Sequence, residues 1–341
     1  GRVELMHLNG ACRYPDLTDL FIRADLSGEA AALQDAIPAM VTAIRDALDG
    51  PLPEVPLGPQ CFAPEPCPFL ERCWPRSPHH VSTLYLLKKS KALELERAGH
   101  DSLTNLPSSL KLSRIQQRQR RSVSTGQLIV EPGLASALDS WARPLVFLDF
   151  ETVAFAIPRF PASRPWDQVP VQYSVHIERG TGFEHRAFLA EGPGDPRTRL
   201  AAALVEACEG AGSVVAYYSK FEDSCLAQLA EAVPRHAEAL NGIRQKLVDL
   251  LPVVREHVYH PAFNGGFSLK VVLPALVPEL AYDDLAIAEG GVASAELGRL
   301  LYGPGMPPGE AARLRQDLLA YCERDTMAMV RLMERLRGLG H

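Results

Sequence analysis

The sequence has no apolar run of about 18 or more residues, so nothing in it predicts a membrane-spanning helix. It also lacks a secretory signal segment, an internal repeat and a low-complexity tract. Basic residues do not dominate, because 35 Lys and Arg stand against 41 Asp and Glu and give a net charge of −6. This balance argues against a broadly basic nucleic-acid-binding protein, although local basic stretches can still contact phosphates. We expect a soluble cytoplasmic protein without a membrane partner.

The apolar content, 47% of 341 residues, is enough for one large core or two modest ones. Alternation and β-branched residues predict strands at residues 145–150, 171–177, 184–189 and 214–217. Helical spacing predicts helices near residues 198–209, 221–232 and 309–336. Strands interleaved with helices predict an α/β fold in which helices flank a mixed sheet.

Acidic residues occur in three separate segments, and their local spacing is informative. Asp149 and Glu151 continue an apolar strand, where alternation sends both side chains to one face. Glu222 opens a predicted helix, and Tyr321 lies one helical turn from Asp325. Mg²⁺ and Mn²⁺ take oxygen ligands, and two such ions about 3.5–4 Å apart promote in-line attack on a phosphodiester. The order of these residues therefore predicts a site for two divalent cations.

Simpler explanations exist for each segment taken alone. Asp149 and Glu151 can be polar residues at a strand end, and Tyr321 can be a core aromatic of a long helix. In the second segment Glu222 is the favoured acidic residue because it directly follows Phe221, and Asp223 is the alternative. Only the combination of the three segments, in this order, favours a metal site.

The three segments resemble motifs I, II and III of the DEDD exonuclease superfamily, in its DEDDy subtype. The third motif of that subtype is Tyr-x-x-x-Asp, as at Tyr321 and Asp325. The second motif departs from the family pattern, since the family carries Asp where this chain has Glu222. The resemblance implies an RNase H-like fold and a Tyr321 that orients the attacking water or helps to deprotonate it. The ordinary pKa of tyrosine, near 10, favours orientation unless bound metals lower it. The resemblance also implies four metal ligands: Asp149, Glu151, Glu222 and Asp325.

Residues 247–251 and 259–274 resemble the corresponding stretch of the DUF2779 family, and the chain is identified as a member of it over nearly its whole length. The resemblance implies a nuclease in the C-terminal half. Within this stretch, Ser268 and Lys270 can contact a phosphate of the scissile strand, but a solvated loop explains Lys270 equally well. Asp249 is either an accessory acidic group or a helix cap, and the cap is favoured.

Three of the seven cysteines, Cys61, Cys67 and Cys73, lie close together in a Pro-rich loop. Without a secretory signal, this cluster indicates metal or cluster ligation rather than disulfides. It resembles the C-terminal cysteine cluster of RecB-like nucleases, which implies a 4Fe-4S cluster completed by one distant thiolate. The spacing differs from the commonest version, so zinc stays an alternative. Cys12 is one candidate for the fourth ligand, and a donor in an N-terminal portion expected to precede Gly1 is the favoured one.

The domain organisation follows from these segments. The chain starts at Gly1 rather than Met, and we expect that an N-terminal portion precedes it. Family resemblance implies that residues 1–80 are the C-terminal remnant of a PD-(D/E)XK nuclease domain with the cysteine cluster. Residues 81–143 are expected to form a partly helical connector, and residues 144–341 the DEDDy RNase H-like domain.

The remaining cysteines and two basic stretches have simpler expected roles. The remaining cysteines, Cys208, Cys225 and Cys322, are expected to be buried small hydrophobes. The basic stretches at residues 88–91 and 114–121 are solvated helix faces or contacts to phosphate.

The expected function is that of a metal-dependent nuclease acting on DNA or RNA, as a 3′-5′ exonuclease that uses two Mg²⁺ or Mn²⁺ ions. An inactive nucleic-acid-binding or scaffold module is the alternative, because the longer Glu222 side chain shifts a ligand oxygen. Hydrolysis of small phosphoesters is a third possibility.

Overall fold

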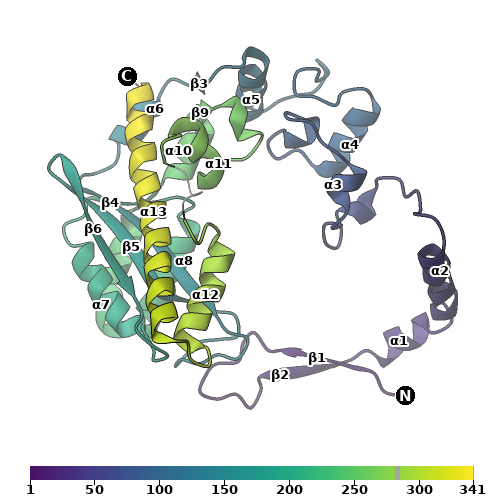
Figure 1. Cartoon of the computed structure of the whole chain (residues 1–341), viewed down its shortest axis with the longest axis horizontal. Helices are drawn as coiled ribbons and strands as arrows, with labels where there is room; N and C mark the ends of the chain where they lie inside the picture. Colours follow the sequence, from purple (N-terminus) through teal and green to yellow (C-terminus); the bar gives the residue numbers. More distant parts are fainter. Residues whose placement is uncertain (281–284, 341) are drawn as a thin grey trace. The chain divides into compact units, whose positions relative to one another are not determined.

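The computed structural model describes residues 1–280 and 285–340. The chain forms two compact units, the first made of residues 1–76 and 154–167 and the second of residues 77–153 and 168–341. Figure 1 shows the elements of both units along the chain. No helix among the described residues has the length and apolar character to cross a bilayer. The predicted domain limits near residues 80 and 143 stay a prediction.

The first unit contains a two-stranded antiparallel sheet, two consecutive helices and short helical turns. Strand β1 (Glu4–Leu8) pairs with β2 (Phe21–Asp25). The helical segment after β2 is divided into α1 (Ser27–Leu33) and α2 (Ile37–Asp49). Pro38 explains the division, because proline fits the first turn of a helix but not its interior. The cysteine loop contains η1 (Pro59–Cys61) and α3 (Leu70–Cys73).

The second unit is built on a five-stranded sheet in the order β6-β5-β4-β7-β8. Its strands are β4 (Leu145–Ala154), β5 (Gln168–Arg179), β6 (Gly182–Leu189), β7 (Ser213–Ala216) and β8 (Leu247–Asp249). The β5–β6 pair is antiparallel, whereas β7 runs parallel to both β4 and β8. The predicted α/β architecture with a mixed sheet is confirmed, and the strand with the first acidic pair lies at its centre.

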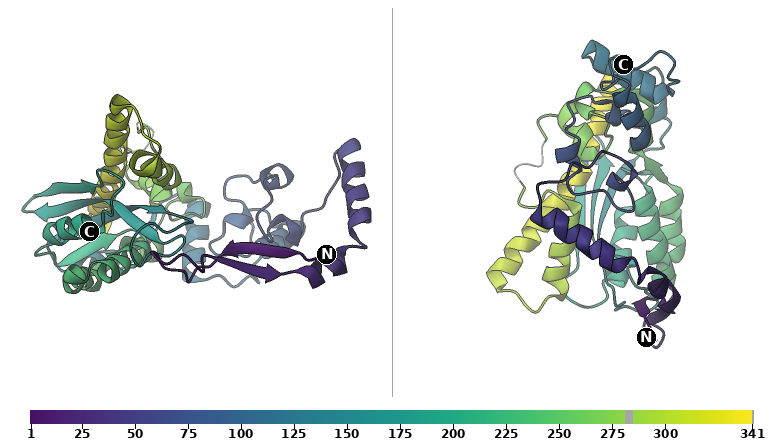
Figure 2. Two further views of the ribbon diagram at one scale, coloured as in Figure 1. Left: turned by 90° about the horizontal axis from the view of Figure 1, so that it is seen from below. Right: turned by 90° about the vertical axis from the view of Figure 1, so that its right-hand side faces the viewer.

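One face of this sheet packs on helices α7 (Arg197–Ala207), α8 (Lys220–Ala232) and α9 (Ala237–Gln245). Alternation along β4 sends Val146, Leu148 and Phe150 into this core, together with Tyr173, Val175 and Ile177 of β5. Figure 2 shows the strands between this helical layer and the C-terminal helices. The intervening side chains of β4, which include Asp149 and Glu151, belong to the opposite face.

The opposite face is covered by the long helix α13 (Pro308–Gly340), close to the range that the sequence predicts. Polar contacts fix it on β5. Gln172 Nε2 donates to the Leu318 carbonyl at 2.8 Å, and the Thr326 hydroxyl lies 2.8 Å from both Ser174 Oγ and His176 Nδ1. Because this helix also carries Tyr321 and Asp325, these contacts set their position over β4.

Other elements surround the edge of the sheet where β4, β7 and β8 end. They are α10 (Leu250–His257), β9 (Val258–Tyr259), η4 (Pro261–Phe263), α11 (Leu269–Leu276) and α12 (Gly290–Tyr302). The turn η3 (Pro234–His236) packs against α7, α8 and α9. Strand β9 pairs with β3 (Ile129–Val130), and α6 (Leu134–Asp139) packs on α13. Ser294 of α12 donates to the Thr152 carbonyl at 2.8 Å, which joins α12 to β4.

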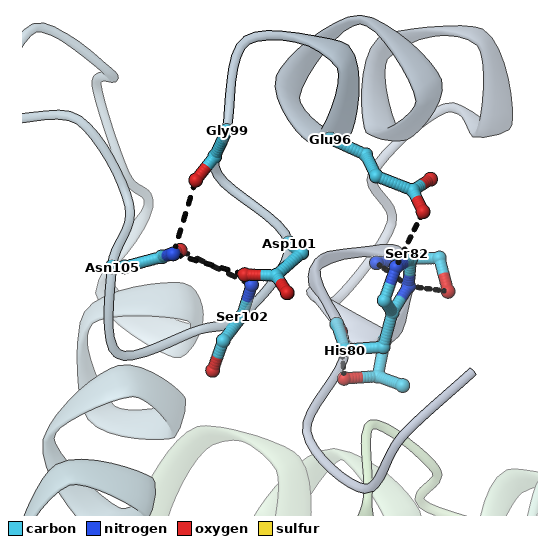
Figure 3. Close-up of polar contacts among 8 residues, drawn as sticks. His80, Ser82, Glu96, Gly99, Asp101, Ser102 and Asn105 are labelled. Atoms are coloured by element: carbon cyan, nitrogen blue, oxygen red, sulfur yellow. Dashed lines mark hydrogen bonds and ion pairs between the residues drawn. The ribbon is translucent and has the colours of Figure 1, made fainter.

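The segment before β3 is helical in part, through η2 (Val81–Thr83), α4 (Lys89–Arg97) and α5 (Arg114–Thr125). Figure 3 shows how side chains hold the loops around α4. The His80 ring lies 2.9 Å from Ser82 Oγ and 3.7 Å from Glu96, and Asn105 donates to the Gly99 carbonyl and to Asp101. These contacts hold η2 and the loop that follows α4.

Candidate active site

Three carboxylates come together between the central strand and the long helix. One oxygen each of Asp149 and Glu151 on β4 and of Asp325 on α13 lies within 4.8 Å of the others. The expectation that strand alternation and the third acidic segment bring these groups together is therefore confirmed for these three residues. A cluster of carboxylate oxygens suits a hard divalent cation.

The electrostatics of this cluster are unfavourable without a cation. The pKa of Asp149 is raised well above its usual value, first by burial and then by the charges of Asp325 and Glu151. Burial and the Asp325 charge raise the pKa of Glu151 to about 8, although Lys270 opposes this shift. Desolvation and like charges both disfavour ionised carboxylates. A bound divalent ion would remove this electrostatic cost, because its positive charge neutralises the carboxylate charges that the fold brings together.

Glu222 lies in the first turn of α8, beside this cluster but outside the 4.8 Å group. Only 3% of the residue is exposed, and its charge contributes to the raised pKa of Asp149. Burial raises the pKa of Glu222 itself to about 8. Its Oε2 atom has no hydrogen-bond partner among the described residues. A buried oxygen without a hydrogen-bond partner costs free energy of folding, and a metal ion would supply the missing partner. Glu222 is therefore suited to be an additional metal ligand.

Asp223 has a different environment. Its two carboxylate oxygens accept hydrogen bonds from Arg244 Nε at 2.8 Å and Nη2 at 3.1 Å. Its side chain is 47% exposed. The geometry thus separates the two candidates of the second acidic segment, with Glu222 toward the cluster and Asp223 in a surface ion pair.

Tyr321 is buried on α13, and its hydroxyl is bonded on both sides. Lys270 Nζ donates to Tyr321 Oη at 3.2 Å, and the hydroxyl is also hydrogen-bonded to the Asp325 carboxylate. Lys270 is held in turn by the Ala288 carbonyl at 2.5 Å. Burial and the neighbouring carboxylates raise the pKa of Tyr321, so the phenol keeps its proton. A protonated hydroxyl at this position can orient a bound molecule by hydrogen bonding.

Cys322 is a contact of the site that the sequence did not reveal. Like Cys208 and Cys225, it is buried as expected. However, its Sγ lies 3.5 Å from Asp149 Oδ2, so the thiol donates to one carboxylate of the cluster. Its position directly after Tyr321 was the available signal, but the rotation of α13 that turns Cys322 toward β4 is set by tertiary packing.

A cavity of about 530 Å³ is lined by Asp149 and Asp325 and extends between α10, α11 and α13. Ser268 and Lys270, both proposed from the sequence as phosphate contacts, line it. Its other walls include aromatic rings that sequence reasoning missed: Tyr85, Tyr217, Tyr218 and Phe267. Aromatic faces next to a cation site suit a ligand with a planar base and a phosphate.

The turn that enters α8 is held by Asp249, at the end of β8. Its carboxylate accepts hydrogen bonds from Tyr218 N at 2.9 Å and Ser219 N at 3.0 Å. It also caps α10 by accepting from Leu251 N at 3.0 Å, which confirms the favoured cap assignment. Tyr218 has φ +72°, a conformation that costs about 1–3 kcal/mol in a residue other than glycine. Asp249 therefore fixes the turn that precedes Glu222 and places this residue beside the cluster.

Removal of the Asp249 carboxylate is expected to destabilise the fold. Asp249→Ala leaves three backbone N–H groups without an acceptor, so we expect the free energy of unfolding to fall by about 3 kcal/mol. Urea denaturation measures this change. Asp223→Ala is the matched control and should cost less than about 1 kcal/mol, because its ion pair with Arg244 is at the surface. Equal losses in the two variants would contradict the positioning role.

The three cysteines of the Pro-rich loop lie in the first unit. Cys61 ends η1, Cys73 ends α3, and Cys67 N donates to the Cys61 carbonyl at 3.0 Å. Among the described residues, the carboxylate cluster is the one group of three or more candidate ligands within 4.8 Å, so the three thiols are not gathered in this way. Cys12 is buried, and its thiol donates to the Asp16 carbonyl. Their role as ligands stays a prediction.

The fold and the site together define an α/β domain in which the central strand and the long helix α13 bring together a half-buried carboxylate cluster that could hold a divalent cation. Residues 146–268 match the family described as "Domain of unknown function (DUF2779)", which confirms the predicted resemblance for this segment. The matched segment contains Asp149, Glu151 and Glu222, whereas Tyr321 and Asp325 lie beyond it.

Two comparisons with known proteins gave similar chains. The chain is 24% identical over 206 residues to "Uncharacterized protein MG366 homolog" of Mycoplasma pneumoniae, which covers 54% of this chain. It spans 31% of the length of that curated relative. Among solved structures, the family B DNA polymerase of the archaeon Pyrobaculum calidifontis is similar with a TM-score of 0.36 and 18% identity, over 57% of this chain and 25% of the polymerase.

Proposed function

We propose that this protein is a metal-dependent nuclease of the DEDDy RNase H-like type, which removes nucleotides from the 3′ end of DNA or RNA. The observation that carries the proposal is the convergence of Asp149, Glu151 and Asp325 within 4.8 Å at a cavity with aromatic walls. The central place of β4 in a five-stranded mixed sheet fits the RNase H-like assignment.

Two Mg²⁺ or Mn²⁺ ions would be held by Asp149, Glu151, Asp325 and Glu222. When bound, such ions supply water activation and stabilise the leaving oxygen of a phosphodiester. Support comes from the donor set, which is all oxygen, from the raised pKa values of the clustered carboxylates, and from the buried Glu222 Oε2 without a partner among the described residues. All three features fit cations at this place.

The other residues of the cavity would position the substrate. The protonated Tyr321 hydroxyl can accept a hydrogen bond from the attacking water while it donates to Asp325. The water oxygen bonds to phosphorus and the bond from phosphorus to the 3′ oxygen breaks. The leaving oxygen takes a proton, so the products are a nucleoside 5′-monophosphate and a new 3′-hydroxyl. Lys270 places a positive charge beside the phosphate, and Tyr218, which is 54% exposed, can stack on the terminal base.

Substitution of Tyr321 tests this assignment of roles. Tyr321→Phe keeps the ring but removes the hydroxyl, so we expect kcat on a 5′-labelled single strand with Mn²⁺ to fall about 10²-fold. The change in KM should be small, because the cavity walls are intact. Tyr173→Phe is the matched control, since Tyr173 is buried on the other face of the sheet, and its kcat should equal that of the wild type. Full activity of Tyr321→Phe would rule out the positioning role.

The position of the label distinguishes the proposed exonuclease from other activities. A 5′-labelled strand should give a ladder that shortens with time, whereas a 3′-labelled strand should release its label at once as a mononucleotide. Internal fragments at early times would contradict exonuclease action. Binding without any turnover would favour the alternative of an inactive nucleic-acid-binding module, in which Glu222 stays outside the ligand cluster.

We also propose that Cys61, Cys67 and Cys73 ligate a 4Fe-4S cluster or zinc with a further donor, within a remnant of a PD-(D/E)XK domain at residues 1–80. A connector at residues 81–143 would join it to the nuclease domain at residues 144–341. Support comes from the spacing of the thiols in one loop. Iron and zinc analysis of anaerobically purified protein tests the ligation. Absence of both metals, with all thiols titrating freely, would overturn it.

A further inference from the structure

A second cavity, of about 710 Å³, lies along α5 in the second unit. Four arginines of this helix line it: Arg114, Arg118, Arg120 and Arg121. The acidic residues of its wall are Glu131 and Glu256, so arginines exceed glutamates by two. In a chain with a net charge of −6, this arginine cavity is a local positive site.

Arg118 forms the buried part of the arginine cavity. Only 3% of this residue is exposed, and its guanidinium donates to the backbone carbonyls of Arg255 and Glu256, at 2.6 Å for the latter. Its Nε has no hydrogen-bond partner among the described residues, and the same holds for His257 Nδ1 in the adjacent wall. A buried guanidinium with an unused donor is rare, because each such group carries a desolvation cost. An anion in the cavity would supply the missing acceptor.

The exposed arginines of the cavity differ in their partners. Arg121 pairs with Glu131 at 2.6 Å. Arg114 and Arg120, by contrast, have neither a hydrogen bond nor an ion pair to any residue that the structure describes. Of the two glutamates, Glu131 is thus engaged by Arg121, and Glu256 lies 3.7 Å from Arg255. Two exposed cations next to a buried one are well suited to bind successive phosphates.

Helix α10 is a shared wall of the arginine cavity and the carboxylate cavity. Leu251 and Arg255 line the carboxylate cavity, and Glu256 and His257, at the end of the same helix, line the arginine cavity. Arg118 fastens this end of α10 through its two carbonyl contacts. A chain-like polyanion whose end lies at the carboxylates can therefore pass along α10 to the arginines.

We propose that the arginine cavity binds phosphates of the single-stranded nucleic acid whose 3′ end lies at the carboxylates. The proposal rests on the proposed function, which identifies the polyanion. In this role Arg114 and Arg120 hold the backbone of the strand at a distance from the scissile bond, and the contact is independent of base sequence.

Fluorescence anisotropy of the full chain with a labelled single strand of about 20 nucleotides tests this site, in EDTA so that no hydrolysis occurs. The double variant Arg114→Gln, Arg120→Gln keeps good helix formers in α5. We expect about tenfold weaker binding, and the slope of log Kobs against log salt should become shallower by about 1.4, which corresponds to two phosphate contacts. The loss of affinity should be the same for DNA and RNA strands of the same sequence.

Lys88→Gln, Lys91→Gln is the matched control, because it removes two exposed cations from the N-terminal end of α4, namely the capping residue Lys88 and Lys91 of the first turn, and it should bind as the wild type does. Unchanged affinity and slope in the arginine double variant would overturn the proposal, as would an equal loss in the lysine control. Hydrolysis of a dinucleotide, too short to reach α5, separates this test from the proposed function. The arginine double variant should cleave it normally, and failure of the wild type to cleave it would count against the nuclease alone.

Discussion

Replacement of Asp149 by asparagine is expected to lower kcat for hydrolysis of a single strand by about 10³-fold or more, equivalent to about 4 kcal/mol of transition-state stabilisation. The reason is geometric, since an oxygen of the Asp149 carboxylate lies within 4.8 Å of oxygens of both Glu151 and Asp325, and Asp149 also accepts a hydrogen bond from Cys322. Asn keeps the size of the side chain but removes the charge that holds a cation. Initial rates with saturating Mn²⁺ measure the loss.

Asp223→Asn is the matched control for this variant. Asp223 was the alternative acidic residue of the second segment, but it pairs with Arg244 at the surface. Its substitution should leave kcat within about twofold of the wild type, because a surface ion pair contributes little. The assignment would fail if Asp149→Asn retained activity, or if both variants lost it to the same extent.

Without metal, the protein is expected to lose thermal stability as the pH rises from about 7 to 8.5, by several degrees in Tm. Glu151 and Glu222 have pKa values near 8 in the folded state, above the ordinary value of 4.5. The folded state therefore retains protons that the unfolded state has released, and its advantage disappears as the pH passes through the folded pKa. Burial lowers the pKa of His176 from 6.5 to about 4. This shift makes the protein more stable as the pH rises, but only below about pH 6.5, so it does not affect the range from 7 to 8.5.

Addition of Mn²⁺ should raise Tm at both pH values, and the increase should be larger at the higher pH, where no protons must be displaced from the carboxylates. Differential scanning calorimetry with EDTA or with Mn²⁺ measures both effects. Glu151→Gln should flatten the pH dependence, whereas Asp223→Asn should leave it unchanged. A metal-free Tm that stays constant or rises across this range would contradict the raised pKa values.

The sequence predicts much of the sheet and its central acidic pair because the signals are local. An apolar run ends in Asp149 and Glu151, and strand alternation alone puts both on one face of β4. The long apolar periodicity near the C-terminus predicts α13, and one helical turn relates Tyr321 to Asp325. Neither local pattern predicts that these two elements converge. That prediction came from the order of the acidic segments in the chain and from the family resemblance.

Other features depend on how elements pack, and no local pattern contains that information. Cys322 has the sequence context of a buried hydrophobe, and only the rotation of α13 brings its thiol to Asp149. Tyr217 and Phe267 are distant in sequence, yet Tyr217 Oη donates to the Phe267 carbonyl at 2.5 Å in the cavity wall. Arg118 belongs to a charged run that favours a solvated face, but α10 and β9 cover it.

The most direct measurement is an anomalous diffraction map of a crystal grown with Mn²⁺. The account predicts two peaks about 3.5–4 Å apart. Both should lie within about 2.0–2.5 Å of carboxylate oxygens. Asp149 should bridge the two ions, with Glu151, Asp325 and Glu222 completing the protein ligands. Peaks confined to other parts of the chain, with Asp149, Glu151 and Asp325 free of manganese, would contradict it.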